Sequence, residues 1–405
     1  MIEYRMERSE YRKPNTENCK LTTVNHILPD KLPRVGTTIF TVMSQLATET
    51  GALNLSQGFP GFDCDPALTE LVGKHMRAGR NQYAPMAGVP VLREQLARKT
   101  AGEYGVTYHP DTEVTIVSGA TEAIFAAVTA VVQPGDEVIV FEPAYDSYVP
   151  AIELNGGVPV YISLAPPNYA VDWAVVEQAI TDRTRLIMVN TPHNPTGRVW
   201  TRADLDQLAR LVQDRAIWLV SDEVYEHILF DGRTHQSLMT HPVLQERTFV
   251  VGSFGKTFHI TGWKVGYCLA PAGLTAAFRK VHQFVTFSTA TPLQYALADY
   301  LSQPSHYRDL PAFYQRKRDL FLAGLVGSRF RWTPAEGSFF QSVAYDAITD
   351  EPDYDLAVRL THDIGVASIP ISVFYHQRTD HRMLRFCFAK TDDVLQEAAE
   401  RLRRL

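Results

Sequence analysis

The sequence predicts an α/β fold in which a largely parallel sheet carries helices on both faces and is followed by a smaller α+β domain. Short apolar, strand-like runs alternate with amphipathic helical stretches between residues 113 and 271, as in parallel sheets whose strands are connected through helices. This alternation stops near residue 305, where a long charged helical pattern begins. No internal repeat or low-complexity linker is visible in the sequence.

Seven runs are expected to form the strands of the sheet, and in chain order they read EVTIV, DEVIVF, VPVYISL, RLIMVNT, IWLVSDE, TFVVGSF and GYCLAP. Helices are expected at 121–133, 172–180 and 202–214, where apolar residues recur at helical spacing. The later region predicts a long helix in HYRDLPAFYQRKRDLFLAGL, then GSFFQSVAY, a helix near 354–364, VASIPIS, MLRFCFA and a final helix that ends at Leu405.

Composition narrows the class of protein. The chain has 405 residues, of which 45% are hydrophobic, so it can bury an ordinary core in roughly two to three domains. Its formal net charge of -6 argues against a duplex-binding protein, whose surface would carry a basic patch. Small-molecule partners are favoured instead, and neither a nucleic-acid nor a membrane partner is expected.

Cysteine usage and hydropathy indicate the compartment. The chain has no CxxC pair, so no structural zinc is expected and the thiols are expected to be reduced; the cysteines are Cys19, Cys64, Cys268 and Cys387. The longest apolar run, at 123–132, is too short to span a bilayer, and the N-terminus has no apolar signal core. These features predict a cytoplasmic location. Residues 1–30 mix basic with acidic residues, unlike transit peptides, and are expected to be a flexible extension or the result of a start site assigned too early.

Polar residues follow several of the predicted strands, and in open α/β sheets ligands bind at the carboxyl ends of strands. After EVTIV, the turn SGATEA places Gly119, Ala120 and Thr121 at the start of a helix. Free backbone N–H groups there, together with the Thr121 hydroxyl, suit a phosphate. Most strand-to-helix turns have this composition, so the turn by itself is equally compatible with an ordinary connection.

Three further strand ends carry candidate functional groups. RLIMVNT leads into PHNPTGRV with Asn194, and IWLVSDEVYEHI contains Asp222 and Tyr225. Asn194 is also compatible with a local side-chain turn, and Asp222 with a helix cap. TFVVGSFGK then brings Ser253 and Lys256 to the end of the next strand.

Taken together, these groups fit pyridoxal 5'-phosphate, whose ring requires a carboxylate beside its nitrogen, an amine for covalent attachment and hydrogen bonds to its 3-oxygen. We expect Asp222 to supply the carboxylate and Lys256 the amine. Asn194 and Tyr225 are expected to bind the 3-oxygen. The phosphate is expected to lie against the turn at 119–121, Ser253 and Lys264.

An ordered set of motifs resembles the class I aminotransferases of the aspartate aminotransferase fold: SQGFP, NQYAP, SGATEA, EPAYDSY, NTPHNPTG, SDEVYEH, SFGKTFHITGWKVGY and MLRFCFA. The resemblance covers the chain from about residue 31 to its end. Within the family it is most similar to the bacterial methionine aminotransferases and to the kynurenine and glutamine transaminases.

This resemblance implies an architecture that periodicity does not give. It implies fold type I of the pyridoxal-phosphate enzymes, with a seven-stranded large domain at 61–305 and a small domain at 306–405. Residues 31–60 would form an N-terminal arm and part of the small domain, preceded by the extension at 1–30. It also implies a homodimer with the active site at the subunit interface.

The resemblance further implies roles for single residues. Lys256, Asp222 and Tyr225 would be the catalytic groups. Tyr145 in EPAYDSY would stack on the cofactor ring, and Tyr83 in NQYAP would reach the partner subunit's phosphate, although ordinary packing is the alternative for both rings. The substrate α-carboxylate would be held by Asn194 and by Arg385 in LRFCFA, whose planar guanidinium makes bidentate contacts that lysine cannot. Gly58 in SQGFP would leave room for that carboxylate.

The expected substrates follow from a missing charge. Dicarboxylate-specific relatives place a second arginine, supplied by the partner subunit, where this chain reads VHQFVTFSTATP at 281–292, and that stretch has no arginine. The side-chain pocket is therefore expected to be apolar, with Phe40, Tyr145, Phe287 and Phe339 as candidate walls. Methionine and aromatic or other apolar amino acids are the expected donors and a 2-oxo acid the acceptor, with ping-pong kinetics.

Other functions remain open from the sequence. Ser288 stands where some kynurenine transaminases carry histidine, which argues against kynurenine as the preferred substrate. A kynurenine or glutamine transaminase with cysteine-conjugate β-lyase activity would use the same groups. A non-enzymatic, aminotransferase-like regulator would need a DNA-binding domain ahead of the cofactor domain, and about thirty residues are too few for one.

Overall fold

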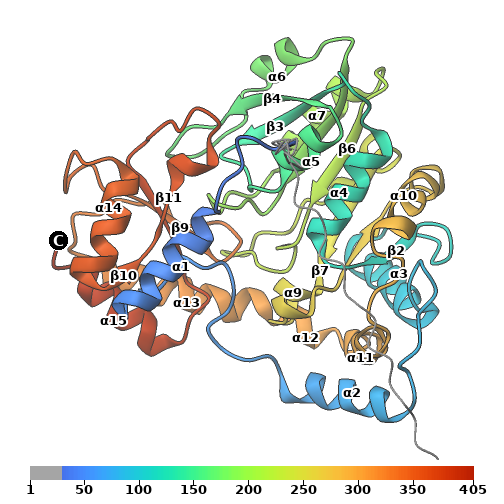
Figure 1. Ribbon diagram of the computed structural model, residues 1–405, viewed down its shortest axis with the longest axis horizontal. Coiled ribbons are helices and arrows are strands. Elements are labelled where there is room, and N and C mark those ends of the chain that lie inside the picture. Colours follow the sequence, from blue (N-terminus) through green and yellow to red (C-terminus); the bar gives the residue numbers. More distant parts are fainter. Residues whose placement is uncertain (1–29) are drawn as a thin grey trace, which may run out of the picture.

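All seven predicted strands form one sheet in the computed structural model, which describes residues 30–405 (Figure 1). The strand order is β2-β8-β7-β6-β5-β3-β4, and only β8 runs antiparallel to its neighbours. The mainly parallel α/β class is therefore confirmed. The strands are β2 (Val114–Val117), β3 (Glu137–Glu142), β4 (Val158–Ser163), β5 (Thr184–Asn190), β6 (Trp218–Asp222), β7 (Thr248–Ser253) and β8 (Gly266–Leu269).

Both faces of the sheet are covered, and the side chains of β3 show how. Val138 and Val140 share a core with α4, α5 and α10, whereas Ile139 and Phe141 share another with α6 and α7. Successive residues of a strand point to opposite faces, so a strand buried on both sides is apolar throughout. The covering helices are α4 (Ala120–Val131), α5 (Tyr148–Leu154), α6 (Trp173–Ala179), α7 (Arg202–Val212) and α10 (Ala272–Val285). The three helices predicted from periodicity are α4, α6 and α7.

Several helices were not predicted individually. They lie before the first strand of the sheet, between β6 and β7, around Lys256, or between the sheet and the C-terminal region. They are α1 (Ile39–Thr50), α2 (Pro66–Arg77), α3 (Pro90–Tyr104), α8 (Pro242–Gln245), α9 (Phe254–Thr257) and α11 (Thr291–Leu301). Three of the longer ones, α2, α3 and α11, have proline in the first turn, where its missing N–H costs no helical hydrogen bond.

The C-terminal region is a smaller α+β unit whose antiparallel sheet has the order β11-β12-β9. The predicted long helix is divided at Asp309, the predicted strand VASIPIS is divided into β10 and β11, and the final helix ends at Leu402 rather than Leu405. Pro311 in the first turn of α13 favours a new helix start there. The elements are α12 (Ser305–Arg308), α13 (Leu310–Leu325), β9 (Phe340–Ala344), α14 (Asp353–Arg359), β10 (Val366–Ala367), β11 (Ile369–Pro370), β12 (Met383–Cys387) and α15 (Asp392–Leu402).

The N-terminal segment joins this C-terminal unit. Strand β1 (Leu53–Asn54) pairs in parallel with β10, and α1 packs against β10 and β11 (Figure 1). Just beyond β1, the Gly61 N–H donates to the Ala389 carbonyl at 2.8 Å. The SQGFP loop is thereby held beside β12, which carries Arg385. The predicted domain boundaries at 60 and 305 stay a prediction. The predictions of an N-terminal extension and of a reduced thiol at Cys19 concern residues 1–29, which lie outside the described residues.

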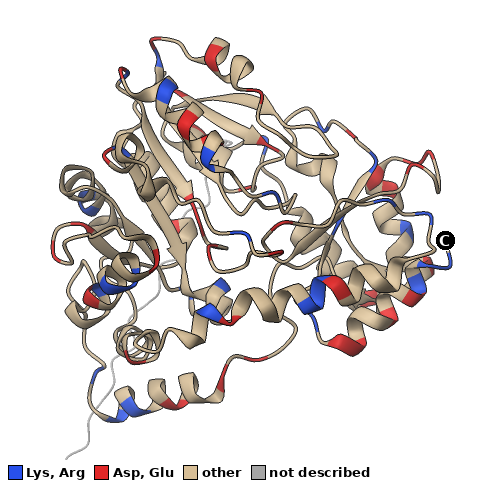
Figure 2. Cartoon of the chain, turned by 180° about the vertical axis from the view of Figure 1, so that it is seen from behind, with Lys and Arg blue, Asp and Glu red and all other residues tan. Residues whose placement is uncertain are grey.

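The distribution of charge and the hydropathy of the helices bear on the expectations from composition. Basic and acidic side chains are interspersed along the chain (Figure 2). Within residues 30–405, every helix is too short or too polar to span a bilayer.

Candidate active site

The candidate site is a cavity of about 290 Å³ that the carboxyl ends of β6 and β7 share with the α4 turn, the SQGFP loop and residues of β9 and β12. Thirteen of the sixteen predicted site residues line it: Phe40, Gly58, Gly119, Ala120, Thr121, Tyr145, Asn194, Asp222, Tyr225, Ser253, Lys256, Lys264 and Arg385. The other three, Tyr83, Phe287 and Phe339, do not. Chain positions more than 300 residues apart therefore meet in one cavity.

Lys256 lies in the one-turn helix α9 directly after β7. Ser253 begins this turn, because its hydroxyl accepts from the Gly255 N–H at 3.2 Å. The Lys256 ammonium donates to the Gly58 carbonyl, with 3.0 Å between Nζ and the oxygen. Burial lowers the pKa of Lys256 to about 8, because the charged amine loses its hydration. A neutral amine is thus accessible near neutral pH, as a nucleophile or general base requires.

Asp222 ends β6 and is 5% exposed. Burial raises the pKa of this carboxyl to about 6, although the Tyr148 hydroxyl opposes that shift by donating to Oδ2 at 2.6 Å. The Val224 N–H donates to Oδ1 at 3.3 Å. A buried carboxylate of this kind is stabilised by a cationic partner. Sequence reasoning missed Tyr148, although it lies in the same EPAYDSY motif as Tyr145 and three residues after it.

The turn at 119–121 forms an anion cradle. Gly119 has a φ of +78° and precedes α4, and no side chain caps that helix, so its first N–H groups lack intrahelical partners. Lys264, which has a left-handed backbone conformation with a φ of +55°, lies beside Gly119. A Cβ on Gly119 would lie 3.4 Å from the Lys264 Nζ atom. The helix start and the lysine therefore face one small volume, which suits a phosphate.

A chain of hydrogen bonds connects Asp222 to Arg385. The Asn190 side chain donates to the Asp222 carbonyl at 2.9 Å and accepts from the Asn194 N–H at 2.8 Å. Arg385 donates from Nη1 to the Asn194 side chain at 2.9 Å and from Nη2 to the Ser56 carbonyl at 2.7 Å. Sequence reasoning missed Asn190, although it is the last residue of β5 and so ends a strand of the sheet as Asp222 does.

Arg385 is fully buried and has no carboxylate partner among the described residues. Its Nε atom is buried without any hydrogen-bond partner there. Burial lowers the pKa of Arg385 to about 10, which still leaves the guanidinium charged at neutral pH. An unpaired buried cation is costly unless a ligand completes it, so the site is suited to a carboxylate.

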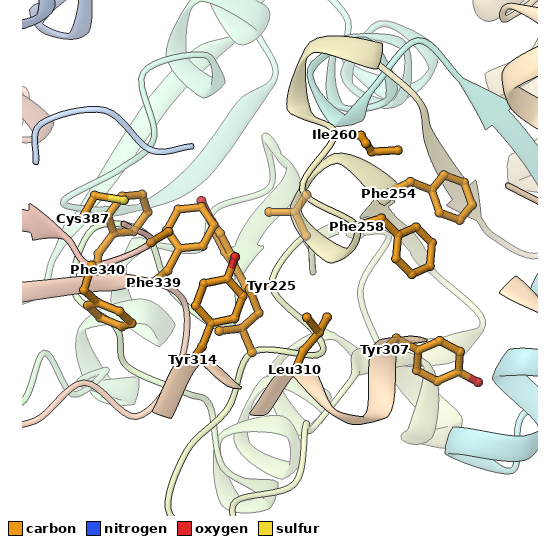
Figure 3. Packing of buried hydrophobic residues seen from close by; sticks show 14 of the residues in the cluster. Tyr225, Phe254, Phe258, Ile260, Tyr307, Leu310, Tyr314, Phe339, Phe340 and Cys387 are labelled. Carbon is orange, nitrogen blue, oxygen red and sulfur yellow. The ribbon is translucent and has the colours of Figure 1, made fainter. Parts of the chain in front are cut away.

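Aromatic rings form the wall around Arg385. Its guanidinium carbon lies 4.0 Å from the centroid of Phe340, 5.2 Å from Phe40 and 5.5 Å from Phe374. Phe340 lines the cavity where Phe339 was predicted to do so. Phe339 is instead fully buried and meets Tyr225 edge to face at 5.0 Å (Figure 3). Neighbouring residues in extended backbone point to opposite sides, and residue types alone did not say which phenylalanine faces the cavity.

Tyr83 and Phe287 lie on the surface of this chain. Their rings pack edge to face with 5.3 Å between centroids, and the residues are 83% and 45% exposed. Both belong to segments that were predicted to serve an active site at a subunit interface. Within one subunit they stay outside the cavity.

The comparisons with known proteins agree with this geometry. A family model described as "Aminotransferase class I and II" matches residues 50–402. Methionine aminotransferase of Escherichia coli is 50% identical over 385 residues, covering 95% of this chain and 100% of that protein. A crystal structure from Escherichia coli, reported to identify a methionine aminotransferase function, superposes with a TM-score of 0.92 at 50% identity over 94% of this chain and 100% of that one. Kynurenine–oxoglutarate transaminase of Dictyostelium discoideum is 34% identical over 410 residues, covering 91% of this chain and 94% of that protein.

Proposed function

The chain belongs to the class I and II aminotransferase family and is a transaminase, and on that premise we propose its substrates and cofactor. It transfers the amino group of methionine and of aromatic or other apolar amino acids to a 2-oxo acid, with pyridoxal 5'-phosphate as cofactor. The observation that carries the substrate class is the buried Arg385 within aromatic walls. One guanidinium binds the α-carboxylate, and the rings receive an apolar side chain.

The residues present fit the proposed cofactor. The uncapped start of α4 and Lys264 offer N–H groups and a positive charge to its phosphate. The Tyr225 hydroxyl makes no hydrogen bond within residues 30–405 and faces the cavity, so it is free to bind the ring oxygen with Asn194. Asp222 lies buried where a protonated ring nitrogen would stabilise its charge. When bound, the cofactor supplies an aldehyde that accepts amino groups and a ring that withdraws electrons.

The chemistry of the chain's own groups follows from these positions. Arg385 and Asn194 orient the substrate so that its Cα lies near Lys256. Lys256, with its lowered pKa, takes the proton from Cα and would pass it to the cofactor carbon that carries the nitrogen; in the second half of the reaction it would move a proton in the opposite direction. Asp222 would hold a proton on the ring nitrogen of the bound cofactor.

Several properties support the preference for apolar donors. Arg385 is the single arginine among the described residues that line the cavity. A second carboxylate, as in aspartate, would lie unpaired against Phe40 or Phe340, and burying it would be costly. The methionine thioether instead makes sulfur–ring contacts worth about 0.3–1.5 kcal/mol.

A substrate panel tests this function. The purified protein with cofactor is incubated with single amino acids and a 2-oxo acid, and the matching oxo acid products are quantified. We expect kcat/KM for methionine and phenylalanine to exceed that for aspartate by at least about 10²-fold, as a missing charge partner implies. Kynurenine, glutamine and a cysteine conjugate belong in the panel, with pyruvate release marking β-lyase activity. Equal efficiency with aspartate and methionine would contradict the proposed specificity.

The proposal includes a homodimer. The surface near Tyr83 exposes three further apolar side chains, and the set would be covered by a second copy; these are Phe284 at 85%, Val285 at 50% and Phe287 at 45%. Tyr83 would then reach the partner subunit's phosphate. Mixing inactive Lys256→Ala chains with inactive Tyr83→Ala chains is expected to restore part of the activity, because one site of each hybrid dimer is intact. A monomer at working concentration, measured by light scattering, would contradict the dimer.

Two further assignments belong to the same proposal. The chain is divided into a large domain at 61–305 and a small domain formed by 306–405 and part of 31–60, and the pairing of β1 with β10 supports this division. A cytoplasmic location is consistent with the unbridged thiols of Cys64, Cys268 and Cys387.

A further inference from the structure

Glu122 and His282 form a buried pair directly behind the phosphate turn, outside the cavity. His282, in α10, is fully buried, and its Nδ1 atom lies 2.9 Å from Glu122 Oε1 in the first turn of α4. The second Glu122 oxygen accepts from the Ser118 N–H at 3.0 Å. Glu122 is thus held at both oxygens, and one of its partners belongs to the SGATEA turn itself.

The other side of His282 contacts the loop that carries Tyr83. Its Nε2 atom lies 3.0 Å from the Met86 carbonyl. Since a carbonyl only accepts, Nε2 carries a hydrogen, and Nδ1 and the Glu122 carboxyl share one more proton between them. The pair is therefore satisfied as a unit, and removing either partner leaves the other with an unmet hydrogen bond in the interior.

The backbone of His282 reaches the second exposed ring. Its carbonyl accepts from the N–H groups of Thr286 and Phe287, at 3.0 and 3.1 Å. Phe287 packs on Tyr83. One buried residue thus connects three segments: the phosphate turn through Glu122, the NQYAP loop through Met86, and the turn after α10 that carries Phe287.

We propose that Glu122 and His282 are a positioning pair. Within one subunit they fix the phosphate turn relative to Tyr83 and Phe287, the two rings that the same subunit presents to its neighbour. This inference rests on the proposed cofactor and homodimer. Neither residue touches cofactor or substrate. The pair acts on its own site through Ser118 and on the neighbouring site through Met86 and Phe287.

Cofactor affinity of the apoprotein is the first test, measured by quenching of tryptophan fluorescence on titration with pyridoxal 5'-phosphate. Glu122→Ala and His282→Ala are each expected to raise the dissociation constant of the cofactor at least about tenfold. The double variant Glu122→Ala/His282→Leu is expected to raise it by no more than the larger single effect, because the two residues act as a unit. The double variant leaves neither member of the pair behind as an unpaired buried side chain, and only the Ser118 N–H and the Met86 carbonyl lose these bonds. It therefore also serves if a single variant does not fold.

Glu122→Gln provides the conservative rescue. A glutamine oxygen accepts from the Ser118 N–H while its amide donates to Nδ1 of a neutral His282, so every hydrogen bond is kept. We expect its dissociation constant to stay within about threefold of wild type. The matched control is His235→Ala, which breaks a buried bond of similar length, 2.8 Å to Glu223, away from the phosphate turn. It is expected to lower Tm and to leave cofactor affinity within about threefold.

Hybrid dimers provide the second test. When Glu122→Ala is placed on the chain that also carries Lys256→Ala, the only working site uses the partner's phosphate turn and the variant chain's Tyr83. We expect kcat/KM of that site to fall at least about threefold below that of the hybrid carrying Lys256→Ala alone. An unchanged hybrid would overturn the action across the interface. Single variants that lose Tm but keep cofactor affinity, as His235→Ala is expected to do, would overturn the positioning role.

These outcomes separate this inference from the proposed function. If wild-type protein forms no covalent, borohydride-reducible adduct with the cofactor, the proposed function fails and this inference with it. If wild type and Glu122→Ala bind the cofactor equally well, only this inference fails.

Discussion

The two sides of the cavity differ in origin and in chemistry. The side that would hold the cofactor comes from the ends of β2, β6 and β7, is polar, and contains the buried Asp222 and Lys256 with pKa values of about 6 and about 8. The side that would hold the substrate comes from the SQGFP loop, β9 and β12, and is aromatic around the single guanidinium of Arg385. The first side is suited to the reaction, and the second to the choice of substrate.

Removing the proposed anchor should have the largest effect. Lys256→Ala is expected to abolish both transamination and the borohydride-reducible absorbance, since no other amine lies where Lys256 does. Lys264→Ala, on the same side but facing the Gly119 turn, should mainly weaken cofactor binding. Measuring the adduct and the cofactor dissociation constant for both variants distinguishes the two lysines. Equal loss of the covalent adduct would mean that the anchor is assigned wrongly.

Removing Asp222 should be next in size. Asp222→Ala removes a charge whose pairing with a buried cation is worth about 3–5 kcal/mol, so kcat is expected to fall by about 10²- to 10⁴-fold. Tyr148→Phe, which removes only the 2.6 Å hydrogen bond to Asp222, is the graded control and should cost about tenfold. Near-normal turnover of Asp222→Ala would return this residue to the role of a helix cap.

The substrate side should respond through KM rather than through the cofactor. Arg385→Lys replaces a planar guanidinium by a point charge that cannot bind a carboxylate through two parallel hydrogen bonds. We expect kcat/KM for methionine to fall by about 10²-fold while the absorbance of the bound cofactor is unchanged. An altered cofactor spectrum would show that the two sides are not separable at Arg385.

The last prediction concerns how the stability of the cofactor-free protein depends on pH. Burial lowers the pKa of Lys256 from 10.5 to about 8. Between these two pH values the folded state therefore binds fewer protons than the unfolded state. The free energy of unfolding should rise with pH across that window, and this gain should be lost as the pH falls through about 8. The contribution is roughly 3 kcal/mol. Urea denaturation of wild type and Lys256→Met at pH 7 and pH 10 measures it, since the variant lacks this gain. Identical pH dependence would place the Lys256 amine in water.

The cofactor side was predictable because its groups follow strand ends in the sequence. Once seven apolar runs are placed in one parallel sheet, the residues after EVTIV, IWLVSDE and TFVVGSF must meet at one edge, and Thr121, Asp222 and Lys256 do. Two partners escaped notice, Tyr148 and Asn190. Tyr148 begins α5 and Asn190 ends β5, and the sequence does not show that these two side chains turn toward Asp222 and Asn194.

The substrate side was predictable only through resemblance. Nothing local to LRFCFA or SQGFP places Arg385 beside Ser56, 329 positions away, because that contact depends on the pairing of β1 with β10 and on the bond from Gly61 to Ala389. Whether Phe339 or Phe340 lines the cavity likewise depends on β9. The pairing of this strand with β12 determines which side of the strand faces the cavity.

The sequence by itself determined the fold class, the strands and the polar groups at their ends, because short apolar runs and helical patterns of apolar residues are local features that extend over a few residues. Only the tertiary structure decided which aromatic ring lines the cavity, which groups hold Asp222 and Asn194 in place, and that Glu122 and His282 join three separate segments. Those outcomes depend on packing and on buried hydrogen bonds between residues far apart in the chain, each of which must be satisfied by whatever partner the whole fold brings near.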